Sequence, residues 1–235
     1  MVSRRTSTQE PLPKGDEKVR AVRTMFDAIA PRYDLVNRIM TFRMDVGWRR
    51  TAVRSLGLPA RSVVVDIACG TGDLCRELAG ADLAPVGIDL SFGMLAAART
   101  TAPLVHGDAL SMPFAGETFD GATCGFALRN FVALDSFFRS LGRVLRPGGR
   151  IALLEVAEPA NPLLRSGHRF YFGKVVPRIG ALLSNGSAYR YLPRSVAYLP
   201  AADELLDLLR AAGFIDVSRT PLSAGIAQLI TATRT

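Results

Sequence analysis

Short apolar runs alternate with longer amphipathic stretches between residues 63 and 156, and few folds accommodate this pattern. The run Val63-Val64-Val65-Asp66 suits a strand that is buried on both faces. Further strands are predicted at residues 85–89, 103–106, 119–126 and 150–156, with helices at 73–78, 92–99 and 134–145. Strands that alternate with helices predict a parallel sheet covered on both faces.

The end of the chain follows a different pattern. A helix is predicted near residues 203–212, followed by strands near 214–219 and 226–232 that a Ser-Ala-Gly turn joins. So short a connection allows only antiparallel pairing, because parallel strands need a crossover. The fold class predicted is therefore α/β: a Rossmann-like, seven-stranded, mostly parallel sheet with helices on both faces and an antiparallel last strand.

A length of 235 residues suits one large domain. Residues 1–16 are polar and lack periodicity, so a flexible tail is predicted there. The remaining residues, 17–235, are predicted to form one domain. Its parts are an N-terminal helical cap (17–57), a cofactor-binding core (62–156), a basic insertion facing substrate or membrane (157–202), and a C-terminal helix with two strands (203–235).

The charge balance favours anionic partners. Lys and Arg number 29 against 21 Asp and Glu, giving a net charge of +8, which suits nucleic acid, an anionic membrane surface or an acidic small molecule. No run reaches the roughly 18 to 20 apolar residues of a membrane span, and the N-terminus lacks a secretory signal. The 3 cysteines show neither disulfide nor zinc spacing, so we expect a cytoplasmic protein without a metal.

A glycine-containing turn follows the first predicted strand. Gly70, Thr71 and Gly72 stand where an α/β sheet brings its backbone close to a ligand. The dinucleotide-binding fingerprint is absent, because Cys75 stands where its third glycine would fall. Asp66 precedes the turn, and its carboxylate would either orient the turn or accept a hydrogen bond from a cationic ligand.

Acidic residues also end the next two predicted strands. Asp89 is placed to accept both hydroxyls of a ribose, and Asp108, followed by Ala109, is placed to accept from an adenine amine. An alternative is that the glycines only turn the chain and the acidic residues cap helices, as Asp73 and Ser91 would.

The segment 66–72 fits the pattern D-x-[AG]-x-G-x-G, and with the two later acids it resembles the class I S-adenosylmethionine-dependent methyltransferases. In that family the turn approaches the methionine portion, the second acid binds ribose and the third segment contacts adenine. The resemblance implies S-adenosyl-L-methionine as methyl donor, without a metal. It implies these cofactor-binding residues: Asp66, Gly70, Thr71, Gly72, Asp89, Asp108, Ala109 and Gly125.

Other segments narrow the resemblance to the C-methyltransferases of menaquinone and ubiquinone biosynthesis. Residues 33–50 resemble the family's N-terminal signature, and residues 143–155 resemble its second signature. Residues 126–130 match its F-G-L-R-N segment, and residues 188–195 match its late Y-x-Y-L-x-x-S block. The implied reaction is methylation of demethylmenaquinol to menaquinol. Asp45 replaces a common histidine, a variant associated with the menaquinone-only members.

Such a reaction needs a reduced ring, because a quinone carbon is a poor nucleophile and a deprotonated quinol carbon is a good one. The cation of Arg129 would stabilise the developing phenolate, and Asn130 would orient the hydroxyl. Asp34, or a bound water, would be the base, and Tyr33 lies beside it in the N-terminal signature. His168 can titrate near neutrality but has no recognisable partner, so no catalytic role is assigned to it.

Residues 159–202 contain no Asp or Glu and interleave basic with aromatic residues. This composition suits either a membrane surface, where an isoprenoid naphthoquinol resides, or a solvated basic lid. We therefore predict peripheral association with the inner face of the membrane, allow a homodimer and expect no nucleic acid partner. Alternatives are a methyltransferase for another lipophilic phenol or quinol, an RNA methyltransferase and a non-catalytic membrane-surface protein.

Overall fold

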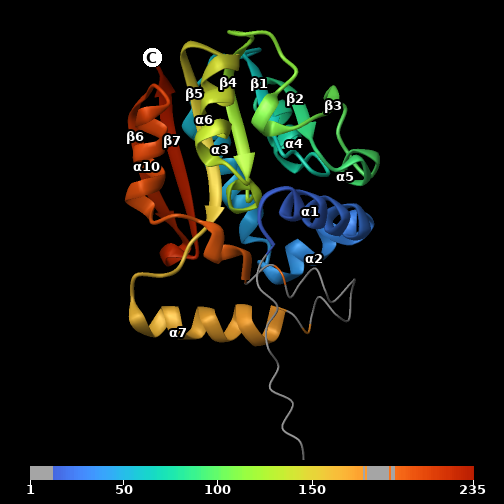
Figure 1. Ribbon diagram of the computed structural model, residues 1–235, viewed down its shortest axis with the longest axis vertical. Coiled ribbons are helices and arrows are strands. Elements are labelled where there is room, and N and C mark those ends of the chain that lie inside the picture. The colour runs from blue at the N-terminus through green and yellow to red at the C-terminus, as the bar shows by residue number, and fades with distance from the viewer. Residues whose placement is uncertain (1–12, 177, 179–190, 192–193) are drawn as a thin grey trace, which may run out of the picture.

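The computed structural model describes residues 13–176, 178, 191 and 194–235. Three helices come first, and strands and helices then alternate along the chain (Figure 1). The α-helices are α1 (Gly15–Ile29), α2 (Tyr33–Met40), α3 (Met44–Leu56), α4 (Asp73–Gly80), α5 (Phe92–Ala96), α6 (Leu134–Val144), α7 (Pro162–Phe170) and α10 (Ala202–Ala211). The strands are β1 (Val63–Ile67), β2 (Ala84–Asp89), β3 (Leu104–His106), β4 (Phe119–Gly125), β5 (Leu145–Val156), β6 (Phe214–Leu222) and β7 (Ala227–Arg234).

The strands form one sheet in the order β3-β2-β1-β4-β5-β7-β6. The pairs among β1 to β5 are parallel, while β7 runs antiparallel to both β5 and β6. The predicted seven-stranded, mostly parallel sheet with an antiparallel last strand is therefore confirmed. Strand β5 begins at Leu145 rather than at residue 150, because its first residue pairs with Phe119 across an irregularity in the ladder.

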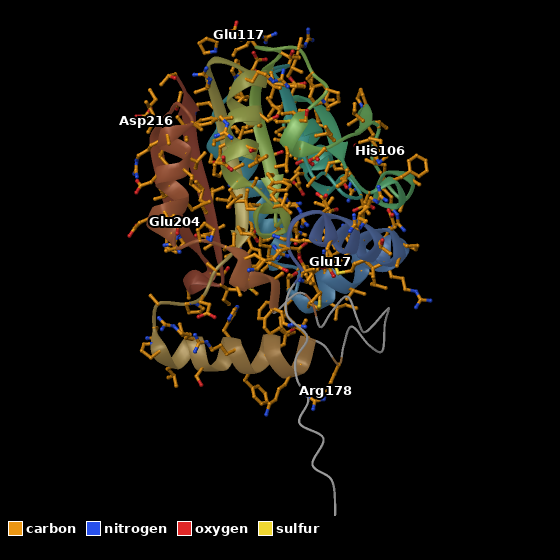
Figure 2. All side chains as sticks on the ribbon, in the orientation of Figure 1. Glu17, His106, Glu117, Arg178, Glu204 and Asp216 are labelled. Carbon is orange, nitrogen blue, oxygen red and sulfur yellow. The ribbon has the colours of Figure 1, made fainter. Side chains whose placement is uncertain are left out.

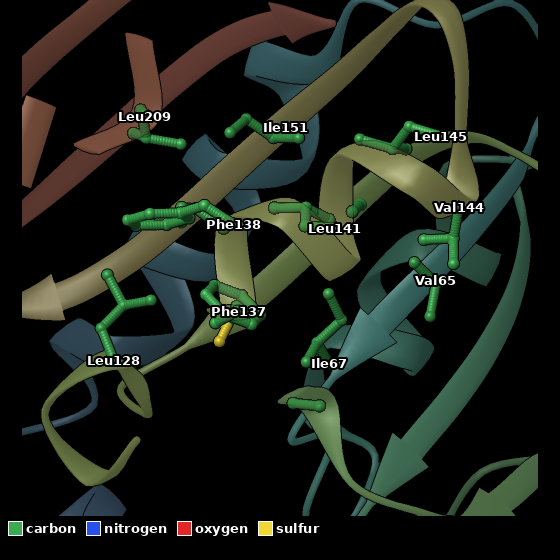
Figure 3. Close-up of a cluster of buried hydrophobic side chains, with 14 of the residues drawn as sticks. Val65, Ile67, Leu128, Phe137, Phe138, Leu141, Val144, Leu145, Ile151 and Leu209 are labelled. Carbon is green, nitrogen blue, oxygen red and sulfur yellow. The ribbon is translucent and has the colours of Figure 1, made fainter. Parts of the chain in front are cut away.

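Each face of the sheet packs against its own set of helices. Val65 and Ile67 point to one face, where Phe137, Phe138 and Leu141 of α6 cover them (Figure 3). The alternate residue, Val64, packs on the other face against α3 and α4. This alternation follows from the two-residue period of a strand. Both faces are buried, as the continuous apolar runs predicted.

The first two helices lie across the carboxyl ends of the parallel strands (Figure 1). Helix α1 begins at Gly15, two residues before the predicted start of the cap. It is fixed at one end by Lys18, whose ammonium donates to the carbonyl oxygens of Arg129 and Phe131 at 2.9 Å each. At its other end the Asp27 carboxylate accepts from the Ser91 hydroxyl at 2.6 Å. The cap thus covers the edge where α/β sheets bind ligands.

Helix α7 lies beyond this cap, apart from the sheet (Figure 1). A π-helical turn, Tyr171–Val175, continues it, and a short 3-10 helix, Val196–Tyr198, precedes α10. Part of the predicted block at residues 188–195, including Tyr189, Arg190, Leu192 and Pro193, lies outside the described residues. Among the residues that are described, none of the helices is both long enough and apolar enough to span a bilayer.

Candidate active site

A cavity of about 110 Å³ lies at the carboxyl ends of the parallel strands, and we call it the polar cavity after the two carboxylates, Asp89 and Asp108, in its otherwise largely apolar wall. Gly70, Asp89, Asp108 and Gly125 line it from four successive strand ends, and helix α1 closes it from the outside. Gly70 has a φ of +55°, and a methyl group built on it would meet no atom within 4 Å. Open space beside a left-handed glycine lets the backbone itself approach a ligand.

Both carboxylate oxygens of Asp89, which lines the polar cavity, accept hydrogen bonds from backbone amides. One of its oxygens accepts from the Gly70 amide at 2.7 Å, and the other accepts from the Ser91 amide at 2.8 Å. Burial raises the pKa of Asp89, while these two amides oppose the shift. A carboxylate oxygen has about two acceptor sites, so each oxygen keeps one for a hydroxyl group. The two oxygens of Asp89 could therefore accept from the two neighbouring hydroxyl groups of a ribose.

Asp108 caps the following 3-10 turn, since one of its oxygens accepts from the Leu110 amide at 2.9 Å. Within the described part of the chain its other oxygen has no hydrogen-bond donor, and the residue lines the polar cavity. An exocyclic amine could donate to that oxygen. The carboxylate acceptors of the polar cavity therefore suit the amine of an adenine and the hydroxyl groups of its ribose.

Asp66 lies behind the turn and does not line the polar cavity. Its two oxygens accept from the Thr123 hydroxyl at 2.8 Å and from the Cys75 thiol at 3.4 Å. Burial raises the pKa of Asp66 to about 7. These two partners lie on β4 and α4, so the carboxylate links the elements beside the turn, and both predicted roles stay predictions.

Thr71 and Gly72 are likewise absent from the lining of the polar cavity. The Thr71 hydroxyl donates to Asp34, which fastens helix α2 to the turn. Gly72 has a φ of +83°, and a methyl group there would lie 2.7 Å from Thr100. Asp73, predicted as a helix cap, instead pairs with Arg38, Arg49 and Arg76, whereas Ser91 caps α5 as predicted.

A second, larger cavity of about 550 Å³ lies between helix α7 and the N-terminal helices. Its wall is mostly apolar and includes Met40, Trp48, Leu164 and Phe172. Tyr33 and Phe126 line both this apolar cavity and the polar cavity, so the two spaces meet at these side chains. Burial raises the pKa of Tyr33, which keeps its hydroxyl protonated near neutral pH.

Arg129 reaches the apolar cavity from the loop after β4. Its Nη1 pairs with Glu155 and also donates to the Phe126 carbonyl at 2.6 Å, and its Nε donates to the Ser195 hydroxyl at 3.1 Å. Glu155 is fully buried and also accepts from the Arg129 amide at 3.1 Å. Among the described residues nothing accepts from Nη2, so this nitrogen can donate to a ligand oxygen.

The sequence model of the ubiE/COQ5 methyltransferase family matches residues 14–234. The chain belongs to this family. It is 43% identical over 223 residues to the ubiquinone/menaquinone biosynthesis C-methyltransferase UbiE of Syntrophotalea carbinolica, covering 90% of this chain and 93% of the relative. It is 42% identical over 228 residues to the demethylmenaquinone methyltransferase of a Roseiflexus species, and the match covers 94% of this chain and 96% of that relative.

Solved structures share the fold at low identity. A Thermotoga maritima S-adenosylmethionine-dependent methyltransferase, described as a possible histamine N-methyltransferase, has a TM-score of 0.64 at 19% identity, covering 91% of this chain and 99% of that one. A Haemonchus contortus phosphoethanolamine N-methyltransferase bound to S-adenosylhomocysteine has a TM-score of 0.59 at 17% identity. The match covers 79% of this chain and about half (52%) of that one.

The two cavities gather most of the residues predicted from the family resemblance. Five predicted cofactor residues line the polar cavity: Gly70, Asp89, Asp108, Ala109 and Gly125. Among the predicted catalytic residues, Tyr33 and Asn130 also line it, and Arg129 lines the apolar cavity. Asp34, the predicted base, lines neither cavity, because it is buried against Thr71.

Sequence reasoning missed the residues that hold these groups in place. Glu155 is the second-last residue of a strand predicted to be buried, and a carboxylate at such a position was a usable signal. Lys18 and Asp27 gave no signal, because their partners are distant in sequence. As for metals, within the described ranges no three His, Cys, Asp or Glu side chains gather in a way that could hold an ion.

Proposed function

We propose that this chain transfers a methyl group from S-adenosylmethionine to a ring carbon of demethylmenaquinol, giving menaquinol. The observation that carries the proposal is the meeting of the polar and apolar cavities at Tyr33 and Phe126. One cavity offers carboxylates for a nucleoside, and the other offers an apolar space for a lipophilic ring. The similarity to curated demethylmenaquinone methyltransferases supports this choice of substrate.

The polar cavity would hold the methyl donor through Asp89 at the ribose, Asp108 at the adenine and the open backbone of Gly70. S-adenosylmethionine, when bound, supplies an electrophilic sulfonium methyl group. Helix α1 covers this cavity with Val19, Val22 and other residues and so excludes water from the reacting atoms.

In the apolar cavity, Nη2 of Arg129, which has no acceptor among the residues that the structure describes, would donate to a ring oxygen and stabilise negative charge as it develops there. Glu155 and Ser195 fix the guanidinium, so its orientation is set before the substrate enters. Asn130 is held in turn by the Tyr191 hydroxyl, which donates to its side-chain oxygen at 3.3 Å. Asn130 lines the polar cavity and not the apolar one, so its amide nitrogen would orient a substrate hydroxyl at the place where the two cavities meet.

The decisive experiment compares acceptors in one labelling assay. The purified chain is incubated with methyl-labelled S-adenosylmethionine and reduced short-chain demethylmenaquinone, a reduced ubiquinone precursor, another lipophilic phenol or total RNA. Label recovered mainly in the naphthoquinol supports the proposal. Label recovered in another phenol or in RNA, with none in the naphthoquinol, would overturn it.

We also propose that the chain docks reversibly on the cytoplasmic face of an anionic membrane. Exposed apolar side chains gather around the apolar cavity, with Leu163 81% exposed on α7 and Phe42 72% exposed after α2. Arg169 lies on the same helix as Leu163, and although it is paired with Glu158 its side chain is 64% exposed and can also contact lipid phosphates. Docking there would let an isoprenoid tail stay in the bilayer while the ring enters the cavity.

Vesicle co-sedimentation tests the docking surface. The variant Leu163→Glu should bind anionic vesicles more weakly than the wild type does. A matched control is Ile215→Glu, which changes an exposed apolar residue on β6 and should bind normally. Equal binding by both variants would contradict docking through α7.

A further inference from the structure

Lys18, near the start of α1, is a buried cation with only 4% of its surface exposed. Its ammonium donates to the carbonyl oxygens of Arg129 and Phe131 at 2.9 Å each, and the centroid of the Tyr198 ring lies 3.7 Å away. In the part of the chain that the structure describes, no carboxylate pairs with it. Its neighbour Glu17 is exposed at the same end of α1 (Figure 2). Burying a charge costs free energy that an apolar side chain avoids, so the ammonium calls for a role.

The two carbonyl groups belong to the loop after β4 and stand on either side of Asn130, which lines the polar cavity. A cation is favourable there, because the last carbonyls of a helical turn lack partners within the turn. The side chain of Arg129 is already fixed by Glu155, so the placement of Asn130 is what depends most on the ammonium. Lys18 itself lines neither cavity, so it acts on a ligand only through this loop.

Helix α1 is the outer wall of the polar cavity. Four of its side chains line the space: Val19, Val22, Arg23 and Phe26. The cavity measures about 110 Å³, whereas pockets for small-molecule ligands usually measure about 300–1,000 Å³, so it has to widen for a whole methyl donor. The opposite wall is formed by the ends of the buried strands, so the helix is the wall that moves. Helix α1 is therefore a lid over the cofactor.

The two ends of this lid are held by different parts of the fold. Near the end of α1, Asp27 accepts from the Ser91 hydroxyl at 2.6 Å and from the Gly93 amide at 2.9 Å, both at the start of α5. Near the start of α1, Lys18 reaches the loop after β4. Burial lowers the pKa of Lys18 to about 8, so the ammonium form prevails at pH 7. Only this end of the lid is attached to a loop that faces both cavities.

We propose that Lys18 is a positioning residue that ties the lid over the methyl donor to the loop that holds the aromatic acceptor, so that the two ligands bind with positive cooperativity. This inference rests on the proposed function, because it assumes a methyl donor in one cavity and a quinol in the other. When α1 covers the donor, the ammonium reaches the two carbonyls and fixes Asn130. When α1 lifts, the loop loses this support. Both ligands favour the closed arrangement, so each tightens the binding of the other.

Calorimetry measures this coupling without turnover. S-adenosylhomocysteine has no methyl group to transfer, so its Kd can be measured with and without saturating reduced short-chain demethylmenaquinone. For the wild type we expect the quinol to lower this Kd at least about fivefold, and in Lys18→Met, which lacks the ammonium, less than about twofold. A wild-type Kd that the quinol leaves unchanged would overturn the inference.

Asp27→Ala is the matched control, because it loosens the other end of the lid without touching the loop. Both variants should bind S-adenosylhomocysteine more weakly than the wild type does, but Asp27→Ala should keep the coupling of the wild type. Wild-type coupling in Lys18→Met, or loss of coupling in both variants, would refute the role of Lys18. If Lys18→Met does not fold, Lys18→Gln takes its place, and its coupling should lie below that of the wild type.

Steady-state kinetics give a second readout. At saturating S-adenosylmethionine, Lys18→Met should raise the KM for the quinol at least about fivefold, whereas Asp27→Ala should change it less than about twofold, since saturating donor closes the lid. Asn130→Ala should raise this KM as well, and adding Lys18→Met should raise it no further, because Lys18 acts through Asn130. A wild type that methylates no quinol would contradict the proposed function. An active wild type without coupling would contradict only this inference.

Discussion

The carboxyl group of Asp66 should make the stability of the protein depend on pH in a way that one substitution removes. Asp66 is buried in the sheet, and its pKa is raised by burial from 3.8 to about 7. In the unfolded chain it would ionise near pH 4. Between these two values the folded state holds a proton that the unfolded state has lost.

The sign follows from proton linkage. A carboxyl group whose pKa is raised on folding stabilises the protein fully below its unfolded pKa, and this stabilisation is lost as pH rises through the folded pKa. Each pKa unit corresponds to about 1.4 kcal/mol, so a shift of about 3 units corresponds to about 4 kcal/mol. The loss should extend from about pH 4 to about pH 7.

Asp66→Asn cannot ionise, and its side-chain oxygen can still accept from the Thr123 hydroxyl. We expect the free energy of unfolding of this variant, minus that of the wild type, to rise by about 4 kcal/mol between pH 4 and pH 7. Urea unfolding at several pH values measures the difference. Asp203→Asn, at an exposed position on α10, controls for the loss of one carboxylate. A difference that stays constant with pH would refute the reasoning.

Three further predictions concern the site and its cover. Gly70→Ala should weaken the binding of S-adenosylhomocysteine, measured by calorimetry, at least about tenfold. The control Gly57→Ala also changes a left-handed glycine with open space beside it, and it should leave the binding unchanged. Arg129→Met leaves the Glu155 carboxylate buried without its partner, so the free energy of unfolding, measured in urea, should fall by about 3–5 kcal/mol. The double variant Arg129→Met/Glu155→Leu should recover part of this loss, because it removes the unpaired charge. Lys18→Met removes both bonds that fix the start of α1, so S-adenosylhomocysteine should dissociate faster in stopped-flow measurements than from an Arg20→Met control.

Local sequence patterns were enough to predict the sheet. The apolar run at residues 63–66 and its successors marked buried strands, and the turn near residue 225 required antiparallel pairing. Strand limits were less predictable: β5 starts earlier than expected because a pairing with Phe119 extends it. Such a pairing depends on a partner that lies 26 residues away, and the local pattern does not contain it.

The direction of each side chain was harder to predict than its position. Asp66 and Asp89 both stand at strand ends, but only Asp89 reaches the polar cavity, since Asp66 turns inward to Thr123 and Cys75. A lone histidine such as His168 carries no sequence signal. Only the fold shows that its Nε2 is buried and has no hydrogen-bond partner in the described part of the chain.

The most direct test of the central claim is methyl transfer from labelled S-adenosylmethionine to short-chain demethylmenaquinone, measured with and without a chemical reductant. The reaction proposed for the apolar cavity needs a ring hydroxyl that can lose its proton, and only the reduced ring has one. We predict labelled menaquinone only when reductant is present. Equal labelling without reductant would contradict the quinol mechanism, and no labelling in either condition would contradict the proposed substrate.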